Sequence, residues 1–198
     1  MLDLNQFAKE VHQNAVEHGW WEGERPFAEV IALIHSEISE ALEEYRAGRP
    51  MVWHACNDQA QEERPTICER CDQCCVKTMY PVAKCTEYNP KPEGIAVELI
   101  DMCIRILDWF GESGETFKKK AEDFEDDYKL PELAANLHYY VSQAFGCFGK
   151  YERAFWLEHA FLSAYIWIKS QGIDVEALML EKHEYNKTRP YKHGGRVC

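Results

Sequence analysis

The sequence has no long hydrophobic run. None of its segments approaches the ~18 consecutive apolar residues that a membrane-spanning helix needs. Residues 1–6 also have neither the basic stretch nor the apolar core of a secretory signal peptide. We therefore expect a cytoplasmic protein with no membrane partner.

Positive charge is also scarce. The 22 Lys and Arg residues stand against 34 Asp and Glu, which gives a formal net charge of −12. This balance argues against nucleic acid or an anionic membrane as the main partner. It does not argue against a nucleotide, because bound Mg²⁺ can bridge acidic residues and phosphates. With 46% hydrophobic residues, the chain is expected to fold as a single domain over residues 1–198.

The alternation of apolar and polar residues that is typical of strands is absent as well. Apolar residues instead recur at helical spacing, and Gly or Pro separates the periodic segments. We predict an all-α domain in which Asp3 and Asp174 are helix N-caps. The expected helices span residues 3–17, 26–47, 95–111, 115–129, 131–145, 151–170 and 175–188.

Cysteine, by contrast, is abundant. In a cytoplasmic chain the nine cysteines are more often thiols or metal ligands than disulfides. His54 and Cys56 are additional candidate metal ligands, outside the cluster that Cys68, Cys71, Cys74 and Cys85 form. An iron–sulfur cluster is a competing hypothesis. The spacing of the ligand cysteines in bacterial ferredoxins would place the next cysteine at position 78, which is a threonine in this sequence. The third hypothesis is a thiol-rich loop that binds no metal. The four cysteines expected to bind a structural Zn²⁺ are Cys68, Cys71, Cys74 and Cys85.

Two pairs of carboxylates lie at i,i+3 spacing within apolar helical segments. The first pair is Glu37 and Glu40, and the second is Glu98 and Asp101. Since residues three apart share a helix face, two such helices packed together would bring the four side chains into one pocket. Carboxylate oxygens suit Mg²⁺ or Mn²⁺. The alternative is salt bridging, for example between Asp101 and Arg105. No E-x-x-H motif occurs, which argues against a ferritin-like di-iron site.

A basic segment near the C-terminus could provide phosphate ligands. Lys182, Asn186 and Arg189 recur at helical spacing and can point at one ligand. The alternative is a solvated basic face, but a nearby metal site favours binding of a triphosphate. Earlier in the chain, Trp20 and Trp21 are either core anchors or stacking partners for a base, and Trp21 is our candidate for the second role.

These motifs together resemble those of the MazG-like all-α nucleoside triphosphate pyrophosphohydrolases, particularly the phage-type members. The family pattern is E-E-x-x-E followed by E-x-x-D, which Ser36–Glu40 and Glu98–Asp101 match apart from the serine. His18–Trp21 and Glu181–Gly195 resemble the same family. The resemblance covers about residues 1–50, 92–111 and 172–196. Segments 51–91, which is Cys-rich, and 112–171, which is helical, look like insertions.

The resemblance implies a helical bundle that hydrolyses an NTP or dNTP to the monophosphate and pyrophosphate, for nucleotide pool control. It implies Mg²⁺ or Mn²⁺ as cofactor and a homodimer or higher oligomer, although the insertion could instead cap the core within one chain. Glu37 and Glu40 would be catalytic, with Glu40 as proton acceptor, and Asp101 or Glu44 could compensate for Ser36. The alternative is a non-catalytic, zinc-containing interaction or regulatory protein.

Overall fold

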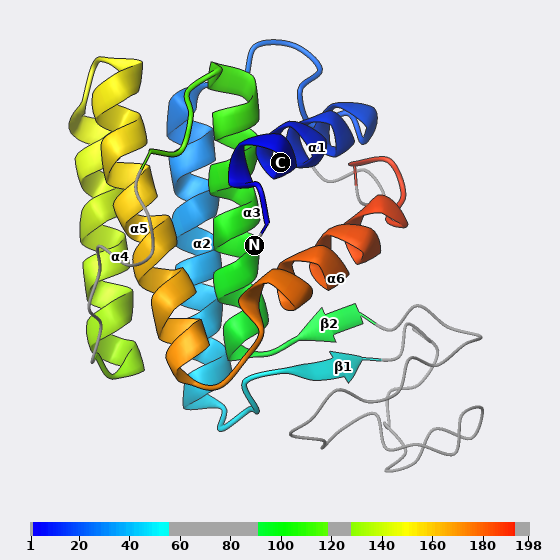
Figure 1. The fold of residues 1–198 in the computed structure, drawn as a ribbon, viewed down its shortest axis with the longest axis vertical. Coiled ribbons are helices and arrows are strands. Elements are labelled where there is room, and N and C mark those ends of the chain that lie inside the picture. The colour runs from blue at the N-terminus through cyan, green and yellow to red at the C-terminus, as the bar shows by residue number, and fades with distance from the viewer. Residues whose placement is uncertain (1, 56–90, 119–127, 193–198) are drawn as a thin grey trace.

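The computed structural model describes residues 2–55, 91–118 and 128–192, and these residues are mostly helical (Figure 1). The all-α class is thus confirmed for the part that is described. No described helix combines the length and apolarity required to span a bilayer. The helices are α1 (Leu4–Glu17), α2 (Phe27–Arg46), α3 (Ile95–Ser113), α4 (Leu130–Gly146), α5 (Lys150–Ser170) and α6 (Val175–Lys187).

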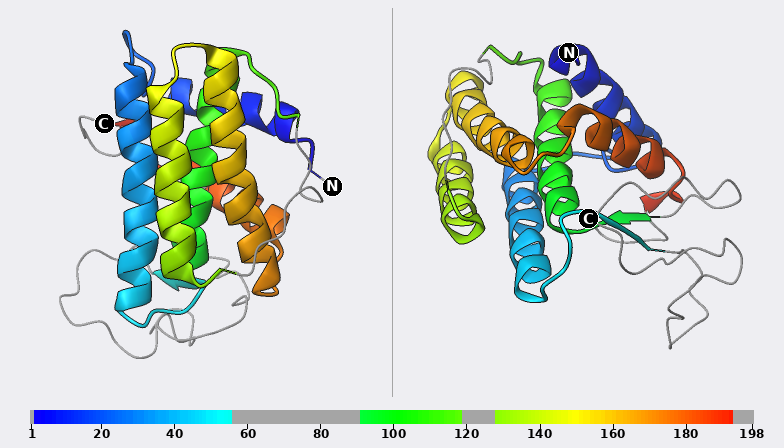
Figure 2. Two further views of the ribbon diagram at one scale, coloured as in Figure 1. Left: turned by 90° about the vertical axis from the view of Figure 1, so that its left-hand side faces the viewer. Right: turned by 60° about the horizontal axis from the view of Figure 1, so that its bottom comes forward.

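Helix α3 is the central element. Helices α2, α3, α4 and α5 run side by side, and α1 and α6 cross the opposite face of α3 (Figures 1 and 2). The reason lies in the sequence of α3, which is apolar on almost every side and therefore needs neighbours all round. Leu99, Ile100, Met102 and Ile106 have no exposed surface.

The α4–α5 hairpin belongs to the same hydrophobic core. It packs along α2 and α3, and its inward residues are fully buried. The sequence predicted these two helices within an insertion at 112–171, and the hairpin covers the α2–α3 pair within one chain. The buried residues on the inward side of α4 and α5 include Leu133, Leu137, Val141, Leu157 and Phe161.

The helix predicted at 115–129 is wrong at its start, because residues 114–118 are not helical and residues 119–127 lie outside the described part. Gly114, with φ of 74°, ends α3 in the left-handed conformation. The chain then turns inward at Phe117, and the centre of its ring lies 4.2 Å from the ring centre of Phe110. Its backbone N–H donates to the Asn5 side chain at 2.8 Å. A tertiary contact thus overrides the helical spacing of this segment.

The structure also contains a short antiparallel sheet that was not predicted from the sequence. Strands β1 (Trp53–Ala55) and β2 (Lys91–Glu93) pair with Trp53 opposite Glu93. Three residues are too few to show the alternation that identifies a strand. The sheet connects the end of α2 to the start of α3. The four candidate zinc ligands, Cys68, Cys71, Cys74 and Cys85, lie between the two strands but outside the described residues.

Both predicted N-caps are confirmed. The Asp3 side chain accepts hydrogen bonds from the backbone N–H groups of Asn5 and Gln6 at 3.0 and 3.2 Å. The Asp174 side chain accepts one from Ala177 at 3.1 Å. Each carboxylate satisfies donors that the first turn of a helix leaves without partners, which is why the local sequence alone located α1 and α6.

Substitution of Gly111 should test the close crossing of α1 and α3. A Cβ atom there would lie 2.4 Å from His12 Cβ and 2.6 Å from the Ala8 carbonyl oxygen. We expect Gly111→Ala to lower the free energy of unfolding by about 1–3 kcal/mol through overpacking. Gly146→Ala is the matched control, because nothing lies within 4 Å of that position. It should raise stability by up to about 1 kcal/mol through helix propensity. Chemical denaturation measures both, and an equal effect of the two substitutions would contradict the crossing.

Candidate functional site

Three predicted metal ligands converge between α2 and α3. Oxygen atoms of Glu37, Glu98 and Asp101 lie within 4.8 Å of one another. Glu37 and Glu98 are only 5% and 7% exposed. The i,i+3 spacing on α3 directs Glu98 and Asp101 to the side that faces Glu37 of α2. The fourth candidate, Glu40, lines the same pocket but is exposed and stands apart from this cluster.

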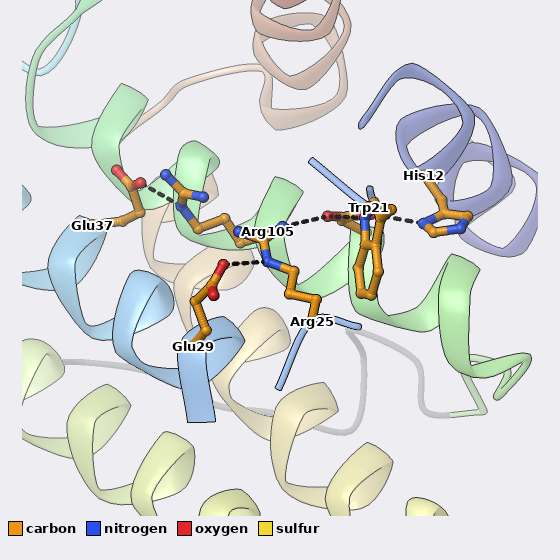
Figure 3. Close-up of polar contacts among 7 residues, drawn as sticks. His12, Trp21, Arg25, Glu29, Glu37 and Arg105 are labelled. Carbon is orange, nitrogen blue, oxygen red and sulfur yellow. Dashed lines mark hydrogen bonds and ion pairs between the residues drawn. The ribbon is translucent and has the colours of Figure 1, made fainter. Parts of the chain in front are cut away.

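Two basic side chains contact the carboxylates. Arg105 Nε donates to Glu37 Oε1 at 2.5 Å, from α3 across to α2 (Figure 3). Lys182 of α6, only 1% exposed, places its Nζ atom 2.8 Å from Asp101 Oδ2. It also donates to the Pro92 carbonyl oxygen at 3.3 Å. Arg105 therefore forms its ion pair across the helix interface, whereas the sequence had suggested Asp101 as its partner.

Burial changes the acidity of the carboxyl groups. It raises the pKa of Glu98 to about 8, with a further contribution from the charge of Asp101. It raises the pKa of Glu37 to about 7, although Arg105 opposes the shift. Burial alone would lower the pKa of Lys182, but the neighbouring carboxylates Asp101, Glu98 and Glu93 together raise it. Three acidic groups thus stand against two permanent cations, and protons offset the excess negative charge when no other cation is bound.

The donor set fits a hard divalent cation. The cluster offers carboxylate oxygens from three side chains, which are the ligands that Mg²⁺ and Mn²⁺ prefer in proteins. Because Glu37 and Glu98 bind protons near neutral pH, a divalent cation would replace those protons and remove the cost of burying the ionised groups. The residues present therefore fit a magnesium or manganese site.

A pocket of about 200 Å³ adjoins the carboxylates and is formed by α1, α2, α3, β2, α6 and the segments that flank them. Its lining combines acidic and basic groups. All three predicted phosphate ligands, Lys182, Asn186 and Arg189, belong to it. The basic residues of the lining are Arg25, Lys91, Arg105, Lys182 and Arg189.

Two sequence segments singled out above are in direct contact in the fold. The ring of His18 lies against the end of α6, with Nε2 3.0 Å from the Arg189 carbonyl oxygen. Lys192 donates its backbone N–H to the His18 carbonyl oxygen at 3.0 Å. The Lys192 Nζ atom lies 3.2 Å from Glu22 Oε2. The His18–Trp21 segment thus holds the segment that follows α6 beside the pocket, and His193–Gly195 lie outside the described residues.

The two tryptophans have different surroundings. Trp21 donates its indole N–H to both Asp108 oxygens, at 2.9 and 3.1 Å, and Asp108 also lies 2.8 Å from His12 Nδ1 (Figure 3). Trp21 is partly buried against the core, whereas Trp20 lines the pocket. The structure therefore gives Trp20, not Trp21, the position suited to contact a ligand.

Glu44 and His54 are engaged away from the carboxylate cluster. Glu44 Oε2 accepts a hydrogen bond from the Trp53 indole at 3.0 Å, and Glu44 is not part of the cluster of Glu37, Glu98 and Asp101. Ser36 Oγ donates to Glu40 at 2.8 Å. His54, a further zinc candidate, lies 2.8 Å from Glu181 on α6.

Sequence reasoning missed several residues of the pocket. Arg25 was overlooked because it precedes α2 in a segment without periodicity. Its side chain is only 7% exposed and lies 2.8 Å from Glu29. Asn14 and His183 also line the pocket. Asn14 stands in ordinary helical sequence with no local signal, whereas His183 lies within the Glu181–Gly195 segment but was given no role.

No protein-family model matches the chain, and the searches of curated proteins and of solved structures found no match either.

Substitution of Gly19 should test the contact between the His18–Trp21 segment and the segment after α6. Gly19 has φ of 79°, and a Cβ atom there would lie 2.4 Å from the Tyr191 ring. We expect Gly19→Ala to displace the exposed Tyr191 ring and to be more destabilising than Gly23→Ala by up to about 1 kcal/mol. Gly23 is a matched control, since its φ is 90° and nothing lies within 4 Å of it. Thermal and chemical denaturation measure the difference, and equal losses would contradict the contact.

The raised pKa values of Glu98 and Glu37 predict how stability depends on pH. Both values exceed the usual 4.5, so the folded state binds these protons more tightly than the unfolded state. The stabilisation is complete below about pH 4.5 and is lost as pH rises through 7 and 8. Each group contributes a slope of up to about 1.4 kcal/mol per pH unit.

We expect Glu98→Gln to flatten this dependence between pH 5 and 9 in metal-free protein, because glutamine does not titrate. Urea denaturation at a series of pH values gives the wild-type and variant curves, and their difference removes the contribution of other groups. Excess Mg²⁺ or Mn²⁺ should oppose the wild-type loss at high pH. Parallel curves for the two proteins would show that Glu98 does not titrate in this range.

Proposed function

We propose that the protein is a Mg²⁺- or Mn²⁺-dependent hydrolase that converts an NTP or dNTP to the monophosphate and pyrophosphate. The observation that carries the proposal is the convergence of Glu37, Glu98 and Asp101 in a pocket that is also lined by five basic side chains. Carboxylates are suited to a metal ion, and basic side chains to phosphate oxygens. A metal-bound polyphosphate needs both in one place.

The position of the sequence motifs supports the same proposal. The E-x-x-E and E-x-x-D segments supply Glu37, Glu98 and Asp101, and the C-terminal motif supplies Lys182 and Arg189. Both groups line one pocket although they are far apart in sequence. The resemblance to the MazG-like pyrophosphohydrolases rests on these same residues, so the motif hypothesis and the pocket geometry point to one chemistry.

Glu37, Glu98 and Asp101 would hold the metal ion, which when bound polarises phosphate oxygens and lowers the pKa of a water molecule. Glu40 is exposed at the same pocket, and its Oε1 accepts the Ser36 hydroxyl. It is our candidate to take the proton from the water that attacks the α-phosphorus. The bond from the α-phosphorus to its bridging oxygen then breaks and releases pyrophosphate.

The basic residues have two roles in this proposal. Lys182 holds Asp101 in place through its 2.8 Å contact, and Arg105 does the same for Glu37. Arg25 and Arg189 line the pocket and would bind phosphate oxygens, which offsets the charge of the leaving pyrophosphate. The guanidinium of Arg25 is oriented by Glu29, 2.8 Å from its Nε atom, and by Asp108, 3.8 Å from its Nη1 atom.

The proposal competes with two others. In one, the ion pairs Arg105–Glu37 and Lys182–Asp101 only stabilise the helix packing, and no metal binds. In the other, the protein is a non-catalytic, zinc-containing regulatory or interaction protein. Release of pyrophosphate from a panel of NTPs and dNTPs, with Mg²⁺ or Mn²⁺, separates the enzyme from both.

We expect Glu37→Gln, Glu98→Gln and Asp101→Asn each to lower kcat/KM for pyrophosphate release by at least about 100-fold, because each removes a charged metal ligand. Glu43→Gln is the matched control, since Glu43 is exposed on the same helix as Glu37 and pairs with Arg46. Circular dichroism should show that all variants remain folded. In addition, the three site variants should bind Mn²⁺ more weakly than the wild type in a calorimetric titration.

Full activity in all three site variants would refute the proposed metal site. A wild-type protein that releases pyrophosphate from no triphosphate in the panel would favour the regulatory protein. In that case a stoichiometric zinc content, measured on protein purified without chelator, would support the second competing hypothesis.

A further inference from the structure

One part of the pocket differs in character from the carboxylate cluster. It is the part lined by residues of α1 and α6 and by Trp20, which follows α1. Helices α1 and α6 both cross the same face of α3 (Figure 1). The two helices meet where the ring of Phe7 lies edge-on to His183, with 5.2 Å between ring centres. We call this part the α1–α6 compartment. Its lining residues are Val11, Asn14, Ala15, Trp20, His183 and Asn186.

Two buried polar atoms in this compartment have no hydrogen-bond partner among the described residues. They are Nε2 of His183 and Oδ1 of Asn186. His183 is only 2% exposed, and both residues line the pocket. The residues are three apart on α6, so their side chains share a face. A buried polar atom without a partner costs about 1–3 kcal/mol, so two such atoms in residues that line one pocket call for an explanation.

The compartment is also electrically neutral. Burial lowers the pKa of His183, and the charge of Lys187 lowers it further, so the ring is uncharged at neutral pH. Asn14 and Asn186 carry no charge. Asn186 Oδ1 accepts hydrogen bonds and would repel phosphate oxygens, which are acceptors too. The sequence suggested Asn186 as a phosphate ligand, but its surroundings suit an uncharged group with hydrogen-bond donors.

The remaining lining residues favour a flat, partly apolar ligand. Trp20 offers an aromatic ring, and Val11 and Ala15 offer aliphatic contacts. Nucleobases combine flat faces, which stack on aromatic rings, with a polar edge that both donates and accepts hydrogen bonds. The basic and acidic groups elsewhere in the pocket match the triphosphate and its metal ion, so the base is the part of the substrate left for this compartment.

We propose that the α1–α6 compartment binds the base of the triphosphate, and that His183 Nε2 and Asn186 Oδ1 hydrogen-bond to its edge and make the enzyme selective for one base. This inference rests on the proposed function for the identity of the substrate. Its physical basis is the pair of atoms without partners. A base that matches them satisfies both, whereas any other base leaves at least one of them buried and unpaired.

The expected selectivity is large. Sites that hydrogen-bond a particular group reject analogues without that group far more strongly than apolar pockets reject a change in size. We therefore expect kcat/KM for the best base to exceed that for the other bases by at least about 100-fold. A hydrolase that removes triphosphates without regard to the base would have no need of these two atoms.

The first experiment measures kcat/KM for pyrophosphate release from the four common NTPs and the four common dNTPs. Asn186→Ala and His183→Phe should each reduce the preference for the best base by at least about tenfold, and change the values for the other bases little. Leu180→Ala is the matched control on α6, because Leu180 is 42% exposed. It should retain the preference.

The second experiment needs no metal and no catalysis. Calorimetric titration of metal-free protein with nucleoside 5′-monophosphates of each base should show at least tenfold tighter binding of the same base that is preferred in hydrolysis. Asn186→Ala should remove this difference. If His183→Phe fails to fold, as judged by circular dichroism, Asn186→Ala alone decides the role of the compartment.

The outcomes separate this inference from the proposed function. Hydrolysis of all triphosphates within tenfold of one another would overturn the inference and leave the function intact. A clear preference that persists in both variants would also overturn it, because other residues would then recognise the base. Selective binding of one monophosphate by a protein that hydrolyses no triphosphate would support the compartment and refute the enzyme. Absence of both hydrolysis and binding would refute both.

Discussion

The candidate site depends on how charge is compensated where α3, apolar on its other sides, carries carboxylates into the interior. Glu98 and Asp101 lie on α3, and Glu37 faces them from α2. An ionised carboxylate is costly in such a place unless a cation lies beside it. Lys182 and Arg105 supply two cations, and the raised pKa values of Glu37 and Glu98 show that these do not fully compensate. The remaining imbalance is what a divalent cation would relieve.

The polar residues of α3, namely Glu98, Asp101, Arg105 and Asp108, form a stripe that connects the parts of the molecule around the pocket. Asp101 contacts Lys182 of α6, and Arg105 contacts Glu37 of α2. Asp108 contacts His12 of α1 and accepts the Trp21 indole N–H. Asp101, Arg105 and Asp108 thus each contact a different neighbour of α3. The packing of the helices and the geometry of the candidate site are therefore set by the same contacts, so a change at one residue of the stripe affects both.

The candidate site was partly predictable because its strongest signals are local. The i,i+3 spacing of Glu98 and Asp101 can be read from one helix, and so can the apolar setting that makes them unusual. The partner of Arg105 could not be read in this way. The sequence suggested Asp101, one turn away, whereas the chain folds so that Glu37 lies closer. Similarly, Trp21 and Trp20 are adjacent in sequence, and only their contacts with Asp108 and with the pocket distinguish them.

The sequence by itself determined the helical class, the caps at Asp3 and Asp174 and the pairs of carboxylates, because each depends on residues within one or two helical turns. Only the tertiary structure decided that the segment at Phe117 turns into the core and that short strands join α2 to α3. It also decided that His183 and Asn186 leave buried atoms without partners. These features depend on residues more than a hundred positions apart or on pairing between segments too short to carry a pattern, and such contacts exist only once the chain has folded.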